Sequence, residues 1–389
     1  MQMCQELRWS RRNVFSARAL GAAAGGLLGA LFPDESGPAE DDRTLSHWCF
    51  ARRAMACEFS VYLPGTAPNP AAAAEGALSE IEEMEGLLSV YRESSALSQL
   101  NRNAADEPVR TDPRLHALLV RAAELTRQTQ GAFDVATGAL IRAWGFLRGP
   151  RRVPSETERA EALSRCGMQH VRLEKDGLTV RFDVRGLEIN LGSIGKGYAI
   201  DRAVARMRDA FRIEAALIQG GSSSLYGLGS PAGDGRGWMI GIQDPYDRRR
   251  CVATVWLRDR ALGTSSISNQ YFEVGGRRYG HILDPRSGMP AEELASASAL
   301  AGDAATADAL ATAFFVMGLD KTAAFCQDHP DVGAVLVRKV SPAGDVGGGP
   351  RVVTFNLSRS DVEVQHGGDE PKRSSPSGGG AANGREDHA

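Results

Sequence analysis

The sequence is poor in lysine, in clustered cysteines and in long apolar runs. Only five of its 45 basic residues are lysines, so the other 40 are arginines, and a lysine inside a glycine-rich motif therefore stands out. The formal net charge of −3 gives no support to nucleic-acid binding as the main function. No uninterrupted apolar run reaches the roughly 18 residues that a membrane-spanning helix needs.

The six cysteines lie far apart, with no C-x-x-C motif and no Cys/His cluster. This spacing argues against a structural zinc site and against a redox dithiol. We expect free buried thiols, although a disulfide in an exported protein is the alternative. With 42% hydrophobic and 24% charged residues in 389, the composition is that of a globular protein and excludes a wholly disordered chain.

The two ends of the chain differ from its middle. Residues 1–35 carry Arg8, Arg11 and Arg12 ahead of an apolar stretch over 17–32, which predicts an export signal. Residues 10–15 resemble the twin-arginine consensus, so we expect export across the cytoplasmic membrane to the periplasm or cell envelope. A disordered leader followed by a short helix is the alternative. Residues 36–46 read as a linker, 47–362 as the folded part, and 363–389 as a disordered low-complexity tail.

The middle predicts an α+β fold, because helices and strands are interleaved without a regular βαβ rhythm. Apolar spacing predicts helices over 71–92, 112–130, 155–166, 194–211, 303–318 and 320–328. Strands are expected at 48–63, within 169–191, and at 215–219, 237–243, 251–257, 333–338 and 351–356. Residues 270–284 predict a hairpin that turns at Gly275-Gly276.

A glycine-rich segment over residues 189–201 runs from a short strand into a helix. Such a turn directs backbone N–H groups and a helix N-terminus outward, which suits an anion, and Lys196 adds a positive charge. The spacing matches neither a Walker P-loop nor G-x-G-x-x-G. Taken alone, the segment could equally be a tight strand-to-helix connection.

Three further segments combine polar groups with apolar surroundings. Phe133 and Asp134 follow a predicted helix, and His281 and Asp284 lie near a predicted strand end. Asp308 and Thr312 are spaced i, i+4 on a helix of small apolar residues, where a hard cation would satisfy their oxygens. The alternatives are a helix C-cap at Phe133, a self-capped turn at Asp284 and a partly solvated helix start at Asp308.

These segments occur in the order found in the FAD:protein FMN transferase (ApbE-type) family, which the chain resembles over roughly residues 50–340. One such motif is weak, but seven in order are specific. The matching motifs are S-x-Y-R with S-x-L-S-x-L-N (89–101), G-A-F-D (131–134), L-G-S-I-G-K-G-Y-A-I-D (191–201), Q-G-G-S (219–222), T-S (264–265), H-I-L-D-P-R-S-G (281–288) and D-A-L-A-T-A (308–313).

The resemblance implies two intertwined α+β subdomains around one flavin cleft. It also implies Mg²⁺-dependent transfer of FMN from FAD to a Thr or Ser hydroxyl of an acceptor flavoprotein, with release of AMP. That acceptor would carry a D-x-x-[ST]-G-A-[ST] motif and could be associated with the membrane. The implied residues are Gly195, Asp308 and Thr312 for Mg²⁺; Met55, Tyr91, Ala132, Phe133, Asp134, Gly192, Tyr198 and Ile282 for FAD; and Lys196 and His281 near the pyrophosphate. From its chemistry we expect His281 to be the base, because the reference pKa of histidine, about 6.5, suits that role, with Asp284 in second place.

The chain departs from the family pattern at four positions. In the first strand, Ala56 and Cys57 replace the usual glycine and hydroxyl residue. Gly195 stands where many members have alanine, and Leu140 occupies the acceptor hydroxyl's place in a partial copy of the acceptor motif. We therefore expect no self-modification at residue 140. Two other activities fit the same residues: Mg²⁺-dependent hydrolysis of FAD, and flavin binding without turnover.

Overall fold

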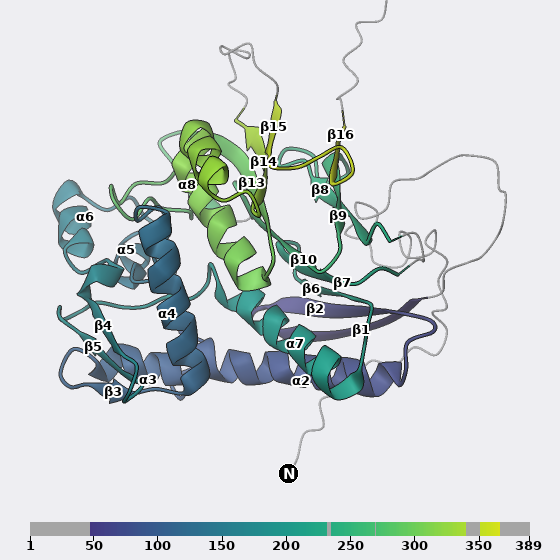
Figure 1. The fold of residues 1–389 in the computed structure, drawn as a ribbon. Coiled ribbons are helices and arrows are strands. Elements are labelled where there is room, and N and C mark those ends of the chain that lie inside the picture. Colours follow the sequence, from purple (N-terminus) through teal and green to yellow (C-terminus); the bar gives the residue numbers. More distant parts are fainter. Residues whose placement is uncertain (1–46, 232–234, 269, 340–350, 366–389) are drawn as a thin grey trace, which may run out of the picture.

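The computed structural model describes residues 47–231, 235–268, 270–339 and 351–365 (Figure 1). The expected export signal, linker and most of the expected tail lie outside these residues. The described helices are α2 (Pro70–Leu88), α3 (Ala96–Asn103), α4 (Pro113–Gln128), α5 (Gly138–Ala143), α6 (Glu156–Leu163), α7 (Gly195–Phe211) and α8 (Ala304–Asp328), with a 3₁₀ turn at Met168–His170.

An eight-stranded sheet forms the centre of the fold, and each of its strand pairs is antiparallel. This sheet with separately packed helices confirms the α+β fold class. Its order is β1 (His47–Ala54), β2 (Cys57–Pro64), β6 (Ala216–Gly220), β7 (Ser224–Leu228), β10 (Arg260–Ser266), β13 (Leu294–Ala301), β14 (Gly333–Arg338) and β15 (Val352–Phe355).

Helices pack on one face of this sheet and a second, smaller sheet packs on the other (Figure 1). Helices α2, α7 and α8 pack on one face, with α8 against β10 and β13. A three-stranded sheet of β16 (Val362–Val364), β9 (Cys251–Leu257) and β8 (Trp238–Gln243) packs on the other. Neighbouring residues of β10 show the alternation, since Ala261 belongs to the helix-side core and Leu262 to the core between the sheets.

A smaller region lies beside the central sheet (Figure 1). It contains α3 to α6, a three-stranded sheet of β3 (Val109–Arg110), β5 (Thr179–Phe182) and β4 (Val171–Glu174), and the hairpin of β11 (Tyr271–Val274) and β12 (Arg277–Gly280). Trp144 anchors this hairpin: its ring lies 5.7 Å from that of Tyr279, and its Nε1 donates to the carbonyl of Gly288 at 2.9 Å.

Several predicted elements are confirmed. The hairpin turns at Gly275-Gly276, and β9, α6 and α7 fall where expected. Helix α6 begins with a capping box, in which both bonds between Ser155 and Glu158 are present. The predicted single strand over 48–63 is wrong: it is two strands joined by a two-residue turn at Met55-Ala56, where both residues have positive φ.

Other elements were missed because their residues carry little periodic signal. Strands β7, β10 and β13 are rich in Ala, Ser and Gly, which have low strand propensity, and α3 and α5 are short. The two helices expected over 303–328 form one element, α8, which Gly318 breaks at φ 74°. By length and composition α8 could cross a membrane, but it is buried against the central sheet.

Candidate active site

A cleft of about 380 Å³ lies between the start of α7, the middle of α8 and the end of the β11–β12 hairpin. It collects residues from segments far apart in the sequence. Its polar lining from these three elements consists of Lys196, Asp308, Thr312 and His281, and Tyr91 stands at its edge, 62% exposed. Residues expected for the metal, the phosphate and the base therefore share one cleft, although Gly195 and Asp284 are not among those that line it.

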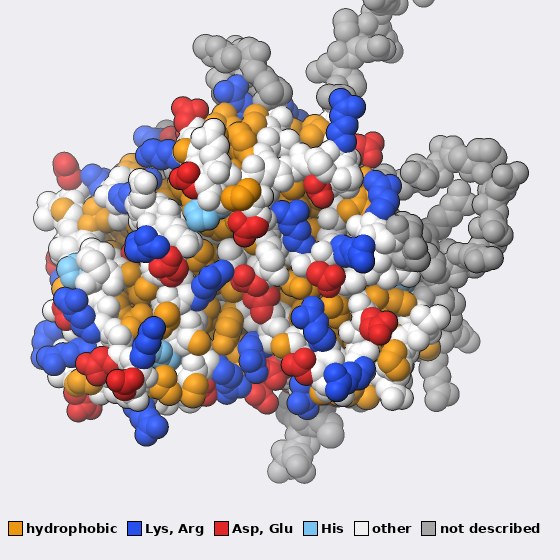
Figure 2. Space-filling view, in the orientation of Figure 1, with side chains coloured by type: hydrophobic (Ala, Val, Ile, Leu, Met, Phe, Trp, Pro, Cys, Tyr) orange, Lys and Arg blue, Asp and Glu red, His pale blue; other side chains and the backbone are white. Residues whose placement is uncertain are grey.

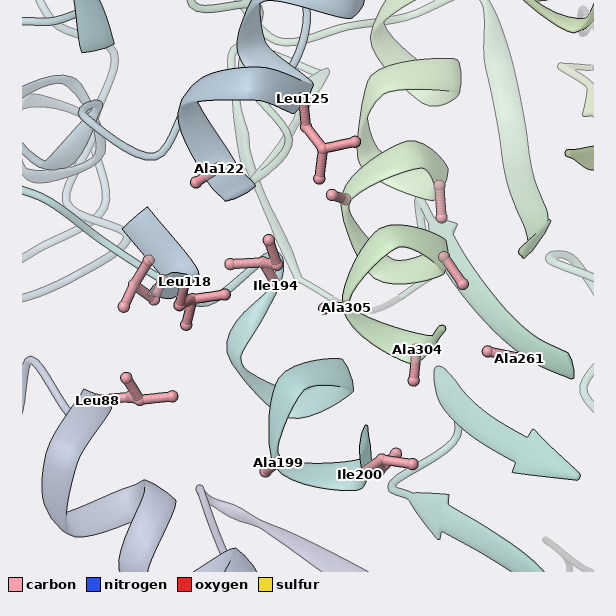
Figure 3. Close-up of a cluster of buried hydrophobic side chains, with 14 of the residues drawn as sticks. Leu88, Leu118, Ala122, Leu125, Ile194, Ala199, Ile200, Ala261, Ala304 and Ala305 are labelled. Carbon is pink, nitrogen blue, oxygen red and sulfur yellow. The ribbon is translucent and has the colours of Figure 1, made fainter. Parts of the chain in front are cut away.

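The glycine-rich turn is fixed by very close packing of α7 on α8. A Cβ on Gly197 would lie 2.0 Å from the carbonyl oxygen of Ala304, so only glycine allows this approach. Figure 3 shows Ile194 of this segment near Leu118 and Leu125 of α4, and Ile200 below Ala304 of α8. Both isoleucines belong to the same hydrophobic core, which anchors the start of α7.

Asp308 is the buried carboxylate of the cleft, with 8% of its surface exposed. Two bonds reach the same oxygen: the backbone N–H of Gly197 donates to Oδ2 at 2.8 Å, and the Ser224 hydroxyl donates to it at 2.9 Å. Burial raises the pKa of Asp308, although Lys196 and these two donors favour the ionised form. Within the part of the chain that the structure describes, Oδ1 has no hydrogen bond.

Thr312 lies one turn after Asp308 on the same helical face and also lines the cleft. Its hydroxyl is 3.3 Å from the Ser265 hydroxyl and 3.3 Å from the carbonyl oxygen of Asp308. Gly195 begins α7, and a Cβ there would meet nothing closer than 3.7 Å, so alanine would also fit. Among the described residues no cluster of three His, Cys, Asp or Glu could hold a metal. Any ion here would have one carboxylate and neutral oxygens as ligands.

Lys196 projects from the first turn of α7 into the cleft. Its Nζ donates to the Ser223 hydroxyl at 2.9 Å, so it is held by a neutral group and keeps its charge for a ligand. The positive end of the α7 dipole lies at the same place. This end of the cleft is therefore suited to the negative charge of a pyrophosphate.

His281 lies at the hairpin end of the cleft. Its Nδ1 is 3.0 Å from the carbonyl oxygen of Gln270, and because a carbonyl can only accept, Nδ1 carries the proton in the neutral ring. The lone pair is then on Nε2. Burial lowers the pKa of His281, and the charges of Lys196 and Arg151 act in the same direction, so the ring is neutral near pH 7. A neutral imidazole with a free Nε2 can accept a proton.

Asp284 does not line the cleft, and its carboxylate is already engaged. Arg286 donates to both its oxygens, at 2.8 Å each, and the Arg286 backbone N–H donates at 2.9 Å. Burial alone would raise the pKa of Asp284, but these bonds outweigh it and the pKa is lowered. The geometry therefore favours His281 over Asp284 as the base.

The ApbE family model matches residues 55–336. The chain belongs to the ApbE family. It is 34% identical to the FAD:protein FMN transferase of Treponema pallidum over 296 residues, which cover 72% of this chain and 81% of that protein. The crystal structure of the ApbE protein of Thermotoga maritima superimposes with a TM-score of 0.70 at 31% identity, covering 77% of this chain and 96% of that one. The apo flavinyl transferase ApbE of Pseudomonas stutzeri superimposes with a TM-score of 0.69 at 26% identity, covering 82% and 100%. The chain is thus an ApbE-type flavin transferase.

The residues that the ApbE resemblance places around FAD divide into two groups. Tyr91, Ala132, Asp134, Gly192 and Ile282 line the cleft. The other three stand outside the lining: Phe133 is buried in the core, Tyr198 donates its hydroxyl to the carbonyl of Arg114 at 3.1 Å, and the Met55 side chain lies beside the start of α7. These three residues can support the residues that line the cleft without contacting a ligand themselves.

Asp134 and Leu140 illustrate how local bonds fix this part of an ApbE fold. Asp134 accepts from the backbone N–H of Ala136 at 2.7 Å and of Met168 at 2.9 Å, which ties the loop after α4 to the 3₁₀ turn. Leu140 is fully buried beside Trp144. At the first strand, Ala56 has a φ of 62° in a turn where the family carries glycine, and the adjacent Cys57 is half-buried.

The structure adds four residues to the ApbE site for which sequence reasoning assigned no role. Each forms a hydrogen bond with an expected site residue. The Ser223 hydroxyl binds Lys196 Nζ, the Ser224 hydroxyl binds the Asp308 carboxylate, the Ser265 hydroxyl binds the Thr312 hydroxyl, and the Gln270 carbonyl binds His281 Nδ1. Ser265 stands in a quoted motif, and Ser223 and Ser224 follow one directly. Serine alone gives no sign of which oxygen it will contact, so their role depended on the tertiary structure.

Proposed function

We propose that this ApbE protein transfers FMN from FAD to a Ser or Thr hydroxyl of an acceptor protein and releases AMP, with Mg²⁺ as cofactor. The observation that carries the proposal is the placement of a neutral histidine and a buried aspartate in one cleft. Both groups line it, and neither Nε2 of His281 nor Oδ1 of Asp308 has a hydrogen bond to a described residue.

The reaction requires one bond to form and one to break at phosphorus. The acceptor hydroxyl oxygen attacks the FMN-side phosphorus of the pyrophosphate, and the bond from that phosphorus to the bridging oxygen breaks, so AMP leaves with the bridging oxygen. His281 Nε2 takes the hydroxyl proton and passes it to solvent or to AMP. Lys196, together with the positive end of the α7 dipole, stabilises the charge that develops on the phosphate oxygens.

The residues also fit a magnesium ion. Oδ1 of Asp308, the Thr312 hydroxyl and the Gly195 carbonyl are hard oxygen donors of the kind that Mg²⁺ takes, with room for phosphate oxygens. When bound, the ion would polarise the pyrophosphate and offset the charge of the leaving AMP. Gly197 and Ser224 fix the carboxylate from its other oxygen, which orients Oδ1 before any ion arrives.

The test is to incubate the protein with FAD, Mg²⁺ and a soluble carrier protein into which a D-x-x-[ST]-G-A-[ST] loop has been grafted. We expect the carrier to gain the mass of FMN by intact mass spectrometry, with one AMP released per FMN attached. FMN and AMP appearing free in equal amounts, with an unchanged carrier, would instead identify an FAD hydrolase, in which water takes the place of the hydroxyl.

We also propose that the protein acts outside the cytoplasm, on an acceptor at the membrane. The support is the arginine pair ahead of the apolar leader. Replacing Arg11 and Arg12 together by lysine should leave the full-length protein in the cytoplasm, as read by cell fractionation. Fractionation that is unchanged by the double replacement would argue against the twin-arginine route.

A further inference from the structure

A second hollow of about 240 Å³ adjoins the cleft, between the β11–β12 hairpin and α8. Its floor is apolar and includes Ile267, Ile282 and Phe315, and its rim includes the rings of Tyr246 and Tyr271. His281 and Ile282 line both this groove and the cleft. A molecule seated in the groove therefore lies against the residue that we assign as the base.

Exposed apolar side chains gather around this groove. Six large hydrophobic side chains are exposed in the described part of the chain, and two of them line the groove: Tyr246 at 49% and Tyr271 at 38%. A third, Val274 at 50%, lies on the same hairpin as Tyr271. Tyrosines at a hydrophobic depression are typical of protein-binding surfaces, because they add contact area with little loss of conformational freedom. Figure 2, in contrast, shows charged side chains of both signs mixed over the face formed by α2, α4 and α7.

The rim of the groove carries an excess of positive charge. Glu292 is paired with Arg277 at 2.9 Å, and Glu273 with Arg278 at 3.3 Å, so these four charges are matched. Lys339 also lines the groove and makes no ion pair with any described residue. An occupant with a carboxylate near Lys339 would complete the pairing.

We propose that the groove is where the acceptor polypeptide docks, with an apolar side chain on the Ile282–Phe315 floor and an acidic side chain at Lys339. A segment held there brings its hydroxyl residue to His281 from outside, while FAD occupies the cleft. This inference rests on the proposed transferase function, and it adds the surface that selects the protein substrate.

The test compares two groove variants with two matched controls. Lys339→Glu is matched by Lys175→Glu in the exposed β4–β5 turn, and Tyr271→Ala by Trp48→Ala, an exposed aromatic on β1. For each protein we would measure the KM for the grafted carrier, the affinity for the carrier without FAD, the Kd for FAD, and FAD hydrolysis without carrier. Each groove variant should raise KM and weaken carrier binding about tenfold. FAD binding and hydrolysis should stay unchanged, as should all four measurements in the controls.

Each other outcome contradicts a specific statement. An unchanged KM and carrier affinity in both groove variants would overturn the docking groove. A weaker Kd for FAD in Tyr271→Ala would show that flavin occupies the groove, which also overturns the proposal. A wild-type protein that binds the carrier, and loses binding in the groove variants, but never transfers FMN would support the groove and contradict the reaction.

Discussion

The two ends of the cleft are built in different ways. At the end where we propose the metal (the metal end), Asp308 is buried and held by two donors. Glycines there bring backbones into contact, and a Cβ added to Gly263 would lie 2.3 Å from the Ala307 carbonyl. At the end where we propose the base (the base end), His281 follows a two-stranded hairpin and is held by one carbonyl, that of Gln270. The difference fits the proposed reaction, because binding phosphate needs fixed geometry and receiving a protein hydroxyl needs an open site.

The largest effect is expected from breaking the metal end. Asp308→Asn keeps the volume and one oxygen but removes the only full negative charge that we assign to the ion, so FMN transfer should fall at least about 100-fold. Steady-state rates against Mg²⁺ concentration would measure this. Activity within about twofold of wild type would remove Asp308 from the metal site.

The base end should respond through rate and pH. His281→Ala should lower the single-turnover transfer rate by about 10²–10⁴-fold while leaving FAD affinity nearly unchanged. Burial lowers the pKa of His281, so the wild-type rate should rise with pH to a midpoint below 6.5 and be level by pH 7. The folded state favours the neutral ring, so this group adds stability above pH 6.5, which is lost as the pH falls. A profile with the same midpoint in His281→Ala would contradict the assignment.

Gly195 and Gly197 test whether the close packing of α7 on α8 stabilises the metal end. Gly197→Ala must displace the Ala304 carbonyl and should lower the free energy of unfolding by about 1–3 kcal/mol. Gly195→Ala has room and removes a helix glycine, so it should be neutral or stabilising by up to about 1 kcal/mol. Chemical denaturation of both variants provides the comparison, and equal destabilisation would show that the close approach at residue 197 does not matter.

Ser224→Ala should have the smallest effect on rate. It removes one of two donors to Asp308 Oδ2 and leaves the Gly197 N–H in place, so the carboxylate should be less well oriented but not lost. Weaker apparent Mg²⁺ affinity, by about tenfold, is expected with little change in the maximal rate. Titration of activity with Mg²⁺ separates the effect on Mg²⁺ affinity from the effect on the maximal rate. An unchanged Mg²⁺ dependence would show that Ser224 does not orient the carboxylate for the ion.

The sequence predicted the two ends unequally. Asp308 and Thr312 could be placed on one helical face from their spacing, and the start of α7 after a glycine-rich turn was also predicted. The short strand expected before that turn is wrong, because residues 183–194, between β5 and α7, form no strand. Strands β10 and β13, on which α8 packs, were not predicted. Their Ala, Ser and Gly residues allow close helix packing but have low strand propensity. The choice between His281 and Asp284 also needed the structure, since only the Arg286 contacts show that Asp284 is already paired.

The division of the cleft into a metal end and a base end is tested most directly by measuring Mg²⁺ binding and FMN transfer on the same proteins. Mg²⁺ binding is measured by calorimetric titration into wild type, Asp308→Asn and His281→Ala, each with FAD present. FMN transfer by the same three proteins is measured by single-turnover mass spectrometry. We predict that Asp308→Asn loses both, whereas His281→Ala loses transfer and keeps wild-type Mg²⁺ affinity. Loss of Mg²⁺ binding in His281→Ala, or its retention in Asp308→Asn, would contradict the account.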